Sequence, residues 1–285
     1  MIFMKIVYFV LDKALSSYYS AMEEQVSIII PIIVALLTGG FIILFLENQH
    51  VGASVIERYH FIMQPFMHRL SNYFKFLSSA KVYFSIKKGT KKDEAEYVFA
   101  FKDLMDKLSH LAHPCIMSGQ DYPVSKFSAI QLDGICDDIN NVWYYWDDKR
   151  NYMQDYCTYN TGKADLHGKI AREYLSEVFP HKYDNMDFSI SLLSDVSGEF
   201  YAKVYEPIQN IPFEYEKWNK EELNFKRWTI FTISFCLFTL VIILLLRYFT
   251  PLCVMNILTL LNIALLASCL YKFSKLESLS RKLFR

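Results

Sequence analysis

Asp106, His110 and His113 come closest to a metal site in this sequence by residue type and spacing. Each helical residue turns the side chain by about 100°, so the three lie within about 60° of one another, as ligands of one ion must. The same rotation places them opposite the apolar face of Met105 and Leu108. The spacing therefore favours a solvated polar face, with a metal site as the weaker alternative.

Two acidic segments, Asp137–Asn141 and Asp147–Asn151, resemble the paired Asp-rich motifs with which isoprenoid synthases hold magnesium and a pyrophosphate. In that family the two motifs lie on facing helices and converge. Here they occupy one expected helix and are rotated from each other by about 80°, so they cannot converge. Solvent-facing acids beside the aromatic segment Trp143–Trp146 are the expected arrangement.

A cluster of lysines could in principle meet lipid headgroups or nucleic acid. Acidic residues follow it at once, and no aromatic side chains interleave it for base stacking. We expect a solvated loop and no nucleic-acid partner. The lysines are Lys81, Lys87, Lys88, Lys91 and Lys92.

Motifs with a known catalytic mechanism are missing from the sequence. It has no Gly-rich phosphate loop, Gly-x-Ser-x-Gly, His-Glu-x-x-His or Cys-x-x-Cys pattern. We therefore expect no cofactor and assign no catalytic residue. An enzyme would need groups that meet only in the fold, with Asp106, His110, His113 and the acids from Asp133 to Asp155 as candidates.

Two long apolar stretches must position all of these groups. Val26–Leu46 carries no charge, and Trp228–Tyr271 carries only Arg247. About 20 apolar helical residues cross a bilayer, so the second stretch can cross, turn at Thr250-Pro251 and cross back. We predict three transmembrane helices, over residues 25–46, 228–248 and 251–271.

Polar residues recur inside the predicted spans. Asn256, Thr259 and Asn262 are spaced by three in the third span, and Thr232 and Thr239 lie in the second. Polar side chains in hydrocarbon need partners. They are expected either to contact a neighbouring helix or to line a pore in an oligomer.

Basic residues near the spans predict the orientation. Lys226 and Arg227 precede the second span, and the tail of residues 272–285 is rich in lysine and arginine. Such residues stay on the cytoplasmic side. We expect a multi-pass protein of the cell inner (plasma) membrane with a cytoplasmic domain over residues 47–227, a cytoplasmic C-terminus and an outside N-terminus. Residues 1–24 are expected to form an interfacial segment.

The domain between the spans is expected to be a soluble helical bundle, which makes the fold class an all-α membrane protein. Apolar residues repeat in steps of three and four from Ile56 to Phe84, which is typical of a helix buried along its length. Further helices are expected over residues 93–112, ending at Pro114, and over residues 125–157, 169–179, 188–205 and 213–227.

These features favour a membrane-anchored, non-enzymatic effector or adaptor that forms homo-oligomers and takes a protein partner through its cytoplasmic domain. Three spans are fewer than a transporter built from two repeated bundles requires. The architecture is similar to that of bacterial antiviral effectors with membrane anchors, so permeabilisation or depolarisation of a membrane is one expected action. The alternatives are a membrane-anchored enzyme with a metal site and a structural subunit of a larger membrane complex.

Overall fold

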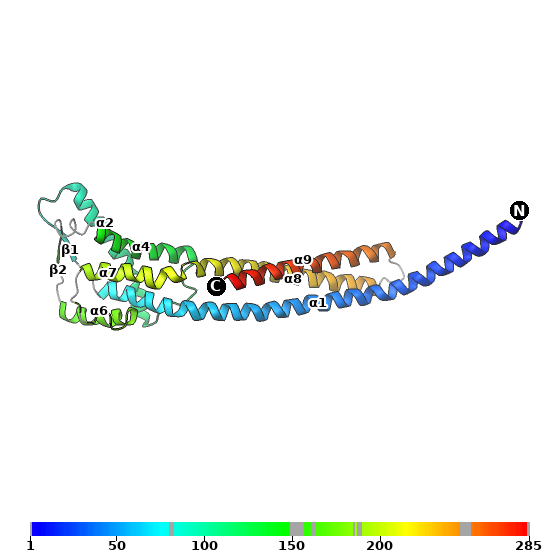
Figure 1. Cartoon of the computed structure of the whole chain (residues 1–285), viewed down its shortest axis with the longest axis horizontal. Coiled ribbons are helices and arrows are strands. Elements are labelled where there is room, and N and C mark those ends of the chain that lie inside the picture. The colour runs from blue at the N-terminus through cyan, green and yellow to red at the C-terminus, as the bar shows by residue number, and fades with distance from the viewer. Residues whose placement is uncertain are drawn as a thin grey trace. The chain divides into compact units, whose positions relative to one another are not determined.

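The computed structural model describes residues 2–79, 83–148, 157–160, 164–184, 186, 190–245 and 252–283, and helices dominate them (Figure 1). The chain divides into two compact units. We call Met1–Val55 together with Lys217–Arg285 the terminal unit, and Ile56–Glu216 the central unit. Helices α1 (Ile2–Ser79) and α8 (Asn210–Leu245) contribute to both.

The terminal unit consists of the first part of α1, most of α8, and α9 (Leu252–Leu283), which lie alongside one another (Figure 1). Small apolar clusters join the helices, among them one of Phe41, Cys236 and Cys269. Three helices are long and apolar enough to cross a membrane, as predicted, and only 22% to 28% of their most apolar windows is buried. Most of this apolar surface therefore faces away from the chain's own core.

The ends of the predicted spans lie within longer helices or outside the described residues. α1 runs without interruption from Ile2, so residues 2–24 belong to the same helix as the first predicted span. The interfacial placement of residues 1–24 stays a prediction. The predicted turn at Thr250-Pro251 and Arg247 lie outside the described residues. The helix expected over residues 213–227 does continue directly into the second span, within α8.

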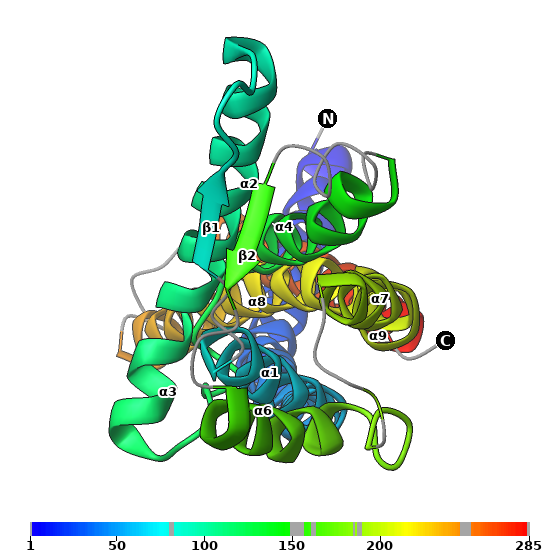
Figure 2. The same cartoon turned by 90° about the vertical axis from the view of Figure 1, so that its left-hand side faces the viewer.

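The central unit packs the second part of α1 against a set of shorter helices (Figure 2). These are α2 (Lys92–His110), α3 (Ala112–Ser118), α4 (Ala129–Asp148), α6 (Ala164–Val178), α7 (Ile190–Phe200), the π-helix η1 (Tyr201–Tyr205) and the 3₁₀-helix η2 (Glu206–Ile208). The helices expected near residues 169–179 and 188–205 thus exist as α6 and as α7 with η1.

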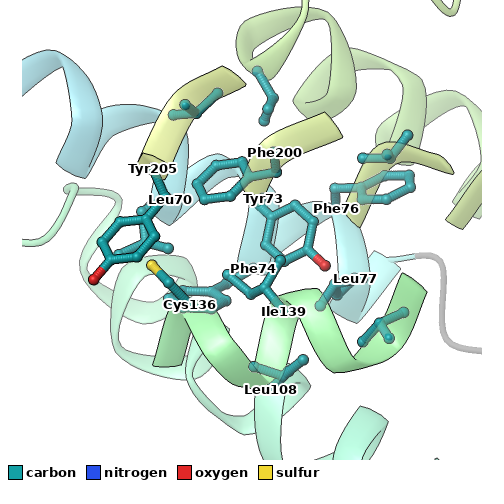
Figure 3. Packing of buried hydrophobic residues seen from close by; sticks show 14 of the residues in the cluster. Leu70, Tyr73, Phe74, Phe76, Leu77, Leu108, Cys136, Ile139, Phe200 and Tyr205 are labelled. Carbon is teal, nitrogen blue, oxygen red and sulfur yellow. The ribbon is translucent and has the colours of Figure 1, made fainter. Parts of the chain in front are cut away.

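The core of the central unit forms along α1. The predicted face is buried from Tyr59 onward, whereas Ile56, its first residue, is 40% exposed. The buried members at steps of three and four are Tyr59, Met63, Phe66, Leu70, Tyr73 and Leu77. Tyr73 lies at its centre (Figure 3). Its ring packs against Phe200 of α7 with centroids 4.8 Å apart, and its hydroxyl is 2.8 Å from the Ser197 hydroxyl. The core is therefore rich in aromatic contacts between α1 and α7.

The all-α prediction holds for the fold as a whole, with a short two-stranded sheet as a local departure. Strand β1 (Tyr83–Ile86) pairs antiparallel with β2 (Cys157–Asn160), in a register that places Tyr83 opposite Asn160. The helix predicted to reach Phe84 ends at Ser79, and Cys157, predicted to end a helix, lies in β2. Aromatic and β-branched residues can adopt either a helix or a strand. Pairing with a strand distant in sequence decides which of the two they form.

The helix predicted over residues 93–112 is broken differently from the expectation. α2 ends at His110, and α3 then continues through Pro114 to Ser118. Proline in the first turn of a helix loses no intrahelical hydrogen bond, so Pro114 fits within the first turn of α3 and does not end a helix. Gly119, with φ of 66°, ends α3 instead. The predicted apolar face of Met105 and Leu108 is buried, and Val98, Phe101 and Ala112 are buried with it.

Candidate functional site

A pocket of about 540 Å³ opens in the central unit between α4 and the α7–η1 segment. α4 contributes Asn140 and Trp143, and α7 contributes Asp195 and Glu199. Tyr183, from the segment after α6, also lines it. A pocket of this size with aromatic walls and a few polar groups is the usual form of a small-molecule site.

The packing of α4 on α7 positions Trp143. A Cβ atom at Gly198 would lie 2.7 Å from the indole Cδ1, closer than any side chain can approach. Glycine therefore lets the α7 backbone press against one edge of the ring. The Ser194 hydroxyl donates a hydrogen bond of 3.4 Å to the Trp143 carbonyl. The rest of the indole, with 38% of the residue exposed, is left to the pocket.

Glu199 is held as a carboxylate by three donors. Its side chain is only 10% exposed and pairs with Lys182, with Lys203 at 2.6 Å, and with the Tyr183 hydroxyl. Burial alone raises the pKa of this carboxyl, but the bonds from Lys182, Lys203 and Tyr183 together lower it to about 2. Glu199 is therefore charged at any physiological pH, and its charge is already compensated.

Asp195 differs from Glu199 although it lies one helical turn earlier on the same wall. It is exposed, and no described residue forms a hydrogen bond or ion pair with it. Its charge acts on Tyr183, whose pKa is raised by burial first, then by Glu199 and Asp195. The pocket therefore offers one carboxylate that is not compensated within the described part of the chain.

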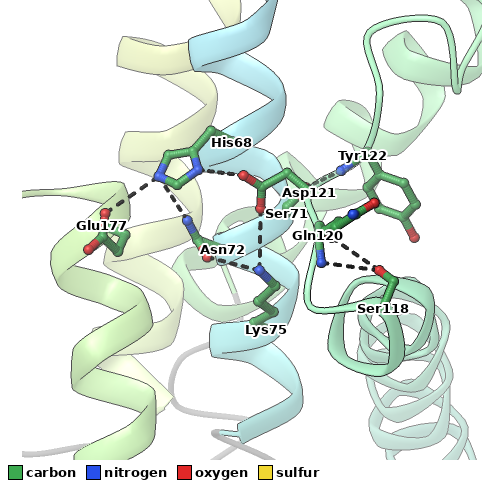
Figure 4. A network of polar contacts seen from close by, with 9 residues as sticks. All are labelled: His68, Ser71, Asn72, Lys75, Ser118, Gln120, Asp121, Tyr122 and Glu177. Carbon is green, nitrogen blue, oxygen red and sulfur yellow. Dashed lines mark hydrogen bonds and ion pairs between the residues drawn. The ribbon is translucent and has the colours of Figure 1, made fainter.

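A second polar network ties together three segments of the central unit (Figure 4). His68 Nδ1 lies 2.6 Å from Asp121, and Nε2 lies 3.4 Å from Glu177 of α6. Asn72 donates to Nε2 at 3.2 Å when the ring is neutral, and Lys75 lies 3.3 Å from Asp121. Protonated His68 can thus bridge two carboxylates, one on α6 and one in the segment after α3.

This network predicts a pH-dependent contribution to stability. The hydrogen bond to Asp121 raises the pKa of His68 above 6.5, against the opposing effect of burial. The stabilisation is complete below the unfolded pKa of 6.5 and is lost as the pH rises through the higher folded pKa. We expect wild type to exceed His68→Gln in unfolding free energy by more at about pH 5.5 than at about pH 8.5.

Denaturant unfolding at the two pH values measures this difference. His60→Gln is the matched control, because His60 is exposed on the same helix. A difference between wild type and His68→Gln that stays constant with pH, or grows toward alkaline pH, would show that the ring does not bridge the carboxylates as a cation.

The residues of the predicted metal site lie together at the surface. Asp106, His110 and His113 line a small pocket of about 150 Å³ with Ser78 and Ser109. Among the described residues, no group of three or more His, Cys, Asp or Glu side chains is arranged to hold a metal ion. Their spacing therefore remains the only argument for a metal role.

The other charged segments show no convergence in the described part of the chain. Asp138 pairs with Lys107 of α2. The side chains of Asp147 and Asp148 are not described, and residues 149–156, including Asp155, lie outside the described residues. In the lysine cluster, Lys81 also lies outside them, and Lys92 is an exposed partner of Glu96 at 3.8 Å.

Four of the five polar residues chosen in the spans are buried within the terminal unit. Asn262 accepts a hydrogen bond of 3.0 Å from the Cys236 thiol. The threonines Thr232, Thr239 and Thr259 donate to carbonyls four residues earlier in their own helices. Asn256 is exposed instead. Whether any of them contributes to a pore stays a prediction.

Sequence reasoning missed the pocket and a buried polar cluster in the terminal unit. Asn48 is fully buried, and its amide atoms have no hydrogen-bond partner among the described residues. One turn later, a Cβ at Gly52 would lie 3.1 Å from Glu222, which is itself buried and pairs with Lys226. In the sequence these features show only as single residues, such as Asn48 beside an apolar run. Whether such a residue is buried depends on which helix packs against it.

Comparison of the chain with protein-family models, curated proteins and solved structures finds no match.

Proposed function

We propose that this protein is a membrane-anchored adaptor or effector whose terminal unit crosses the bilayer and whose central unit binds a ligand. The observation that carries the anchoring is the exposure of apolar side chains on all three long helices. In each of these helices at most 28% of the most apolar window is buried, so at least 72% of it is not. The pocket beside Trp143 supports the ligand-binding part.

The exposed residues are large and lie within the predicted spans. Leu36 on α1, Phe238 on α8 and Leu260 on α9 are each more than half exposed. Soluble monomers rarely expose apolar patches of this extent, whereas hydrocarbon covers them without cost. A bilayer around the terminal unit would remove this apolar surface from water.

Amphipathic side chains mark one end of the terminal unit. The Lys272 ammonium lies 4.4 Å from the centre of the Trp228 ring, and Lys275 pairs with Glu221 at 2.9 Å. Tryptophan and lysine concentrate at the boundary between lipid and water. This end fits the cytoplasmic face of an inner membrane, with the central unit and the C-terminus on the same side.

Fractionation of cells that express the full chain tests the anchoring. The protein is expected in the membrane fraction and is expected to resist extraction by alkaline carbonate. Protease added outside intact cells is expected to leave the central unit whole. Recovery in the soluble fraction would refute the anchoring, and external cleavage within the central unit would refute the orientation. Sizing in detergent tests homo-oligomer formation, which a strict monomer would contradict.

Pore formation is a second candidate function, and the exposed amide of Asn256 on α9 favours it. An amide that faces outward from the terminal unit needs a partner in hydrocarbon, and a second copy of the chain can supply one. The membrane permeabilisation expected of an antiviral effector would follow from such an assembly.

The pore candidate makes its own prediction. Ion flux through vesicles that contain the protein is expected to fall about 5- to 30-fold for Asn256→Leu, given that an interhelical hydrogen bond in membranes contributes roughly 1–2 kcal/mol. The matched control is Leu260→Ile, an exposed residue of α9 without a polar group. Absence of flux in wild type, or equal flux in both variants, would leave the adaptor as the function.

A further inference from the structure

We propose that the pocket beside Trp143 binds an organic ammonium cation that carries methyl or alkyl groups. The inference rests on the proposed function, because it takes the central unit as the ligand-binding part, and it names the ligand class. Three features support it: aromatic walls, an uncompensated carboxylate, and a lining that disfavours anions.

The aromatic surface that a cation can use comes from two helical segments of the chain. Trp143 of α4 and Tyr201 of η1 line the pocket with open aromatic surface, and Met186 adds a polarisable apolar side chain. The third aromatic wall, Tyr183, already carries the Lys182 ammonium 5.2 Å from its ring centre, so Trp143 and Tyr201 are the rings left to a ligand. The faces of aromatic rings attract alkylated ammonium ions, most strongly those of tryptophan. Gly198 holds one edge of the indole against α7, so the ring is placed before a ligand arrives.

Asp195 supplies the opposite charge. It lines the same pocket, and no described residue pairs with it, so a cationic ligand gains an ion pair without displacing a protein partner. The amide of Asn140, across the pocket on α4, can accept a hydrogen bond from a polar substituent of the ligand.

Anions find no comparable partner among the described residues. Lys182 lines the pocket, but it pairs with Glu199 and lies 5.2 Å from the centre of the Tyr183 ring. Near Tyr201 the potential is also negative. Burial raises the pKa of its hydroxyl first, and the carboxylates of Asp137, Asp133 and Glu206 raise it further.

The volume suits a small cation. About 540 Å³ lies within the range of roughly 300–1,000 Å³ that is usual for small-molecule pockets. Such a cation could be a free metabolite or a lipid headgroup, because both can carry the same trimethylammonium group. The test has to separate the two sources.

Calorimetric titration of the full chain in a maltoside detergent provides the test. Choline is the probe, and 3,3-dimethyl-1-butanol is its uncharged isostere. We expect saturable choline binding and at least about tenfold weaker binding of the isostere. Equal binding of the two compounds, or no saturable choline binding up to roughly 50 mM, would overturn the proposal.

Variants localise the binding. Asp195→Asn and Trp143→Leu are each expected to weaken choline binding about tenfold. Asp184→Asn is the matched control, since Asp184 is a nearby carboxylate that pairs with His181 and does not line the pocket. Gly198→Ala is expected to displace the indole and weaken binding as well. Choline affinity unchanged in Asp195→Asn, Trp143→Leu and Gly198→Ala would overturn the assignment to this pocket.

Two vesicle preparations separate the sources. If the protein binds choline more weakly in phosphatidylcholine vesicles than in phosphatidylglycerol vesicles, the phosphatidylcholine headgroup competes for the pocket, which identifies a headgroup ligand. Equal choline affinity in the two preparations identifies a free cation. Either result supports the ligand class. Membrane fractionation is independent of these titrations: failed choline binding in a membrane-bound protein refutes this inference alone, and a soluble protein that binds choline refutes the anchoring alone.

Discussion

Leu36→Arg is expected to impair membrane insertion by about 2.5–3.5 kcal/mol, the cost of an arginine near the centre of a transmembrane helix. Leu36 is 72% exposed on α1, within the first predicted span, so the new charge would face lipid rather than the chain's own core. In water the same substitution would change little, because an exposed leucine contributes little to folding. The variant thus separates a lipid environment from an aqueous one.

The control is Ile130→Arg, which places the same charge on a residue of α4 that is 74% exposed in the central unit. The fraction of protein recovered in membranes is the measurement. We expect a marked loss for Leu36→Arg and none for Ile130→Arg. Unchanged recovery of Leu36→Arg would mean that lipid does not surround this face, and the proposed anchoring would fail.

Tyr73→Ala is expected to lower the unfolding free energy of the protein by about 3–5 kcal/mol, as is usual for removal of a buried aromatic side chain. Tyr73 is fully buried, packs on Phe200 and bonds to Ser197. Its removal leaves a cavity where α1 meets α7 (Figure 3). Denaturant unfolding followed by near-ultraviolet circular dichroism measures the change.

Tyr73→Phe is the matched control because it keeps the ring and removes only the hydroxyl. The expected loss is about 1 kcal/mol, since the Ser197 hydroxyl keeps its 2.6 Å bond to the Leu193 carbonyl. If the two variants lost equal stability, the hydroxyl pair rather than the packing would hold α1 and α7 together. If Tyr73→Ala lost less than about 1 kcal/mol, this contact would not belong to the core.

Local patterns explain the parts of the fold that could be predicted. Apolar steps of three and four along α1 correctly identified buried residues from Tyr59 to Leu77, because helical periodicity alone decides which side chains share a face. The same holds for Val98 to Ala112. Elements that depend on a distant partner were missed: β1 exists through its pairing with β2, and each strand alone has only four residues.

The candidate site illustrates the same limit. Asp106, His110 and His113 attracted notice because their spacing is local, yet they line only a small surface pocket. Asp195 and Trp143 carry no recognisable spacing, since they lie on different helices. The close approach of α7 to Trp143 depends on Gly198, a residue whose role is invisible until the indole is placed beside it.

The residue order alone determined the three apolar helices, the burial pattern along α1 and the absence of known catalytic motifs. Hydropathy and helical period are properties of neighbouring residues, so no tertiary contact is needed to find them. Folding in three dimensions was required for the rest. It turned Thr232, Thr239, Thr259 and Asn262 inward and Asn256 outward, and it left Asp195 without a partner among the described residues while Lys182 and Lys203 compensated Glu199. Lys203 lies four residues from Glu199, but the burial of these side chains and the contact of Lys182 with Glu199 depend on how separate segments pack, which the residue order does not decide.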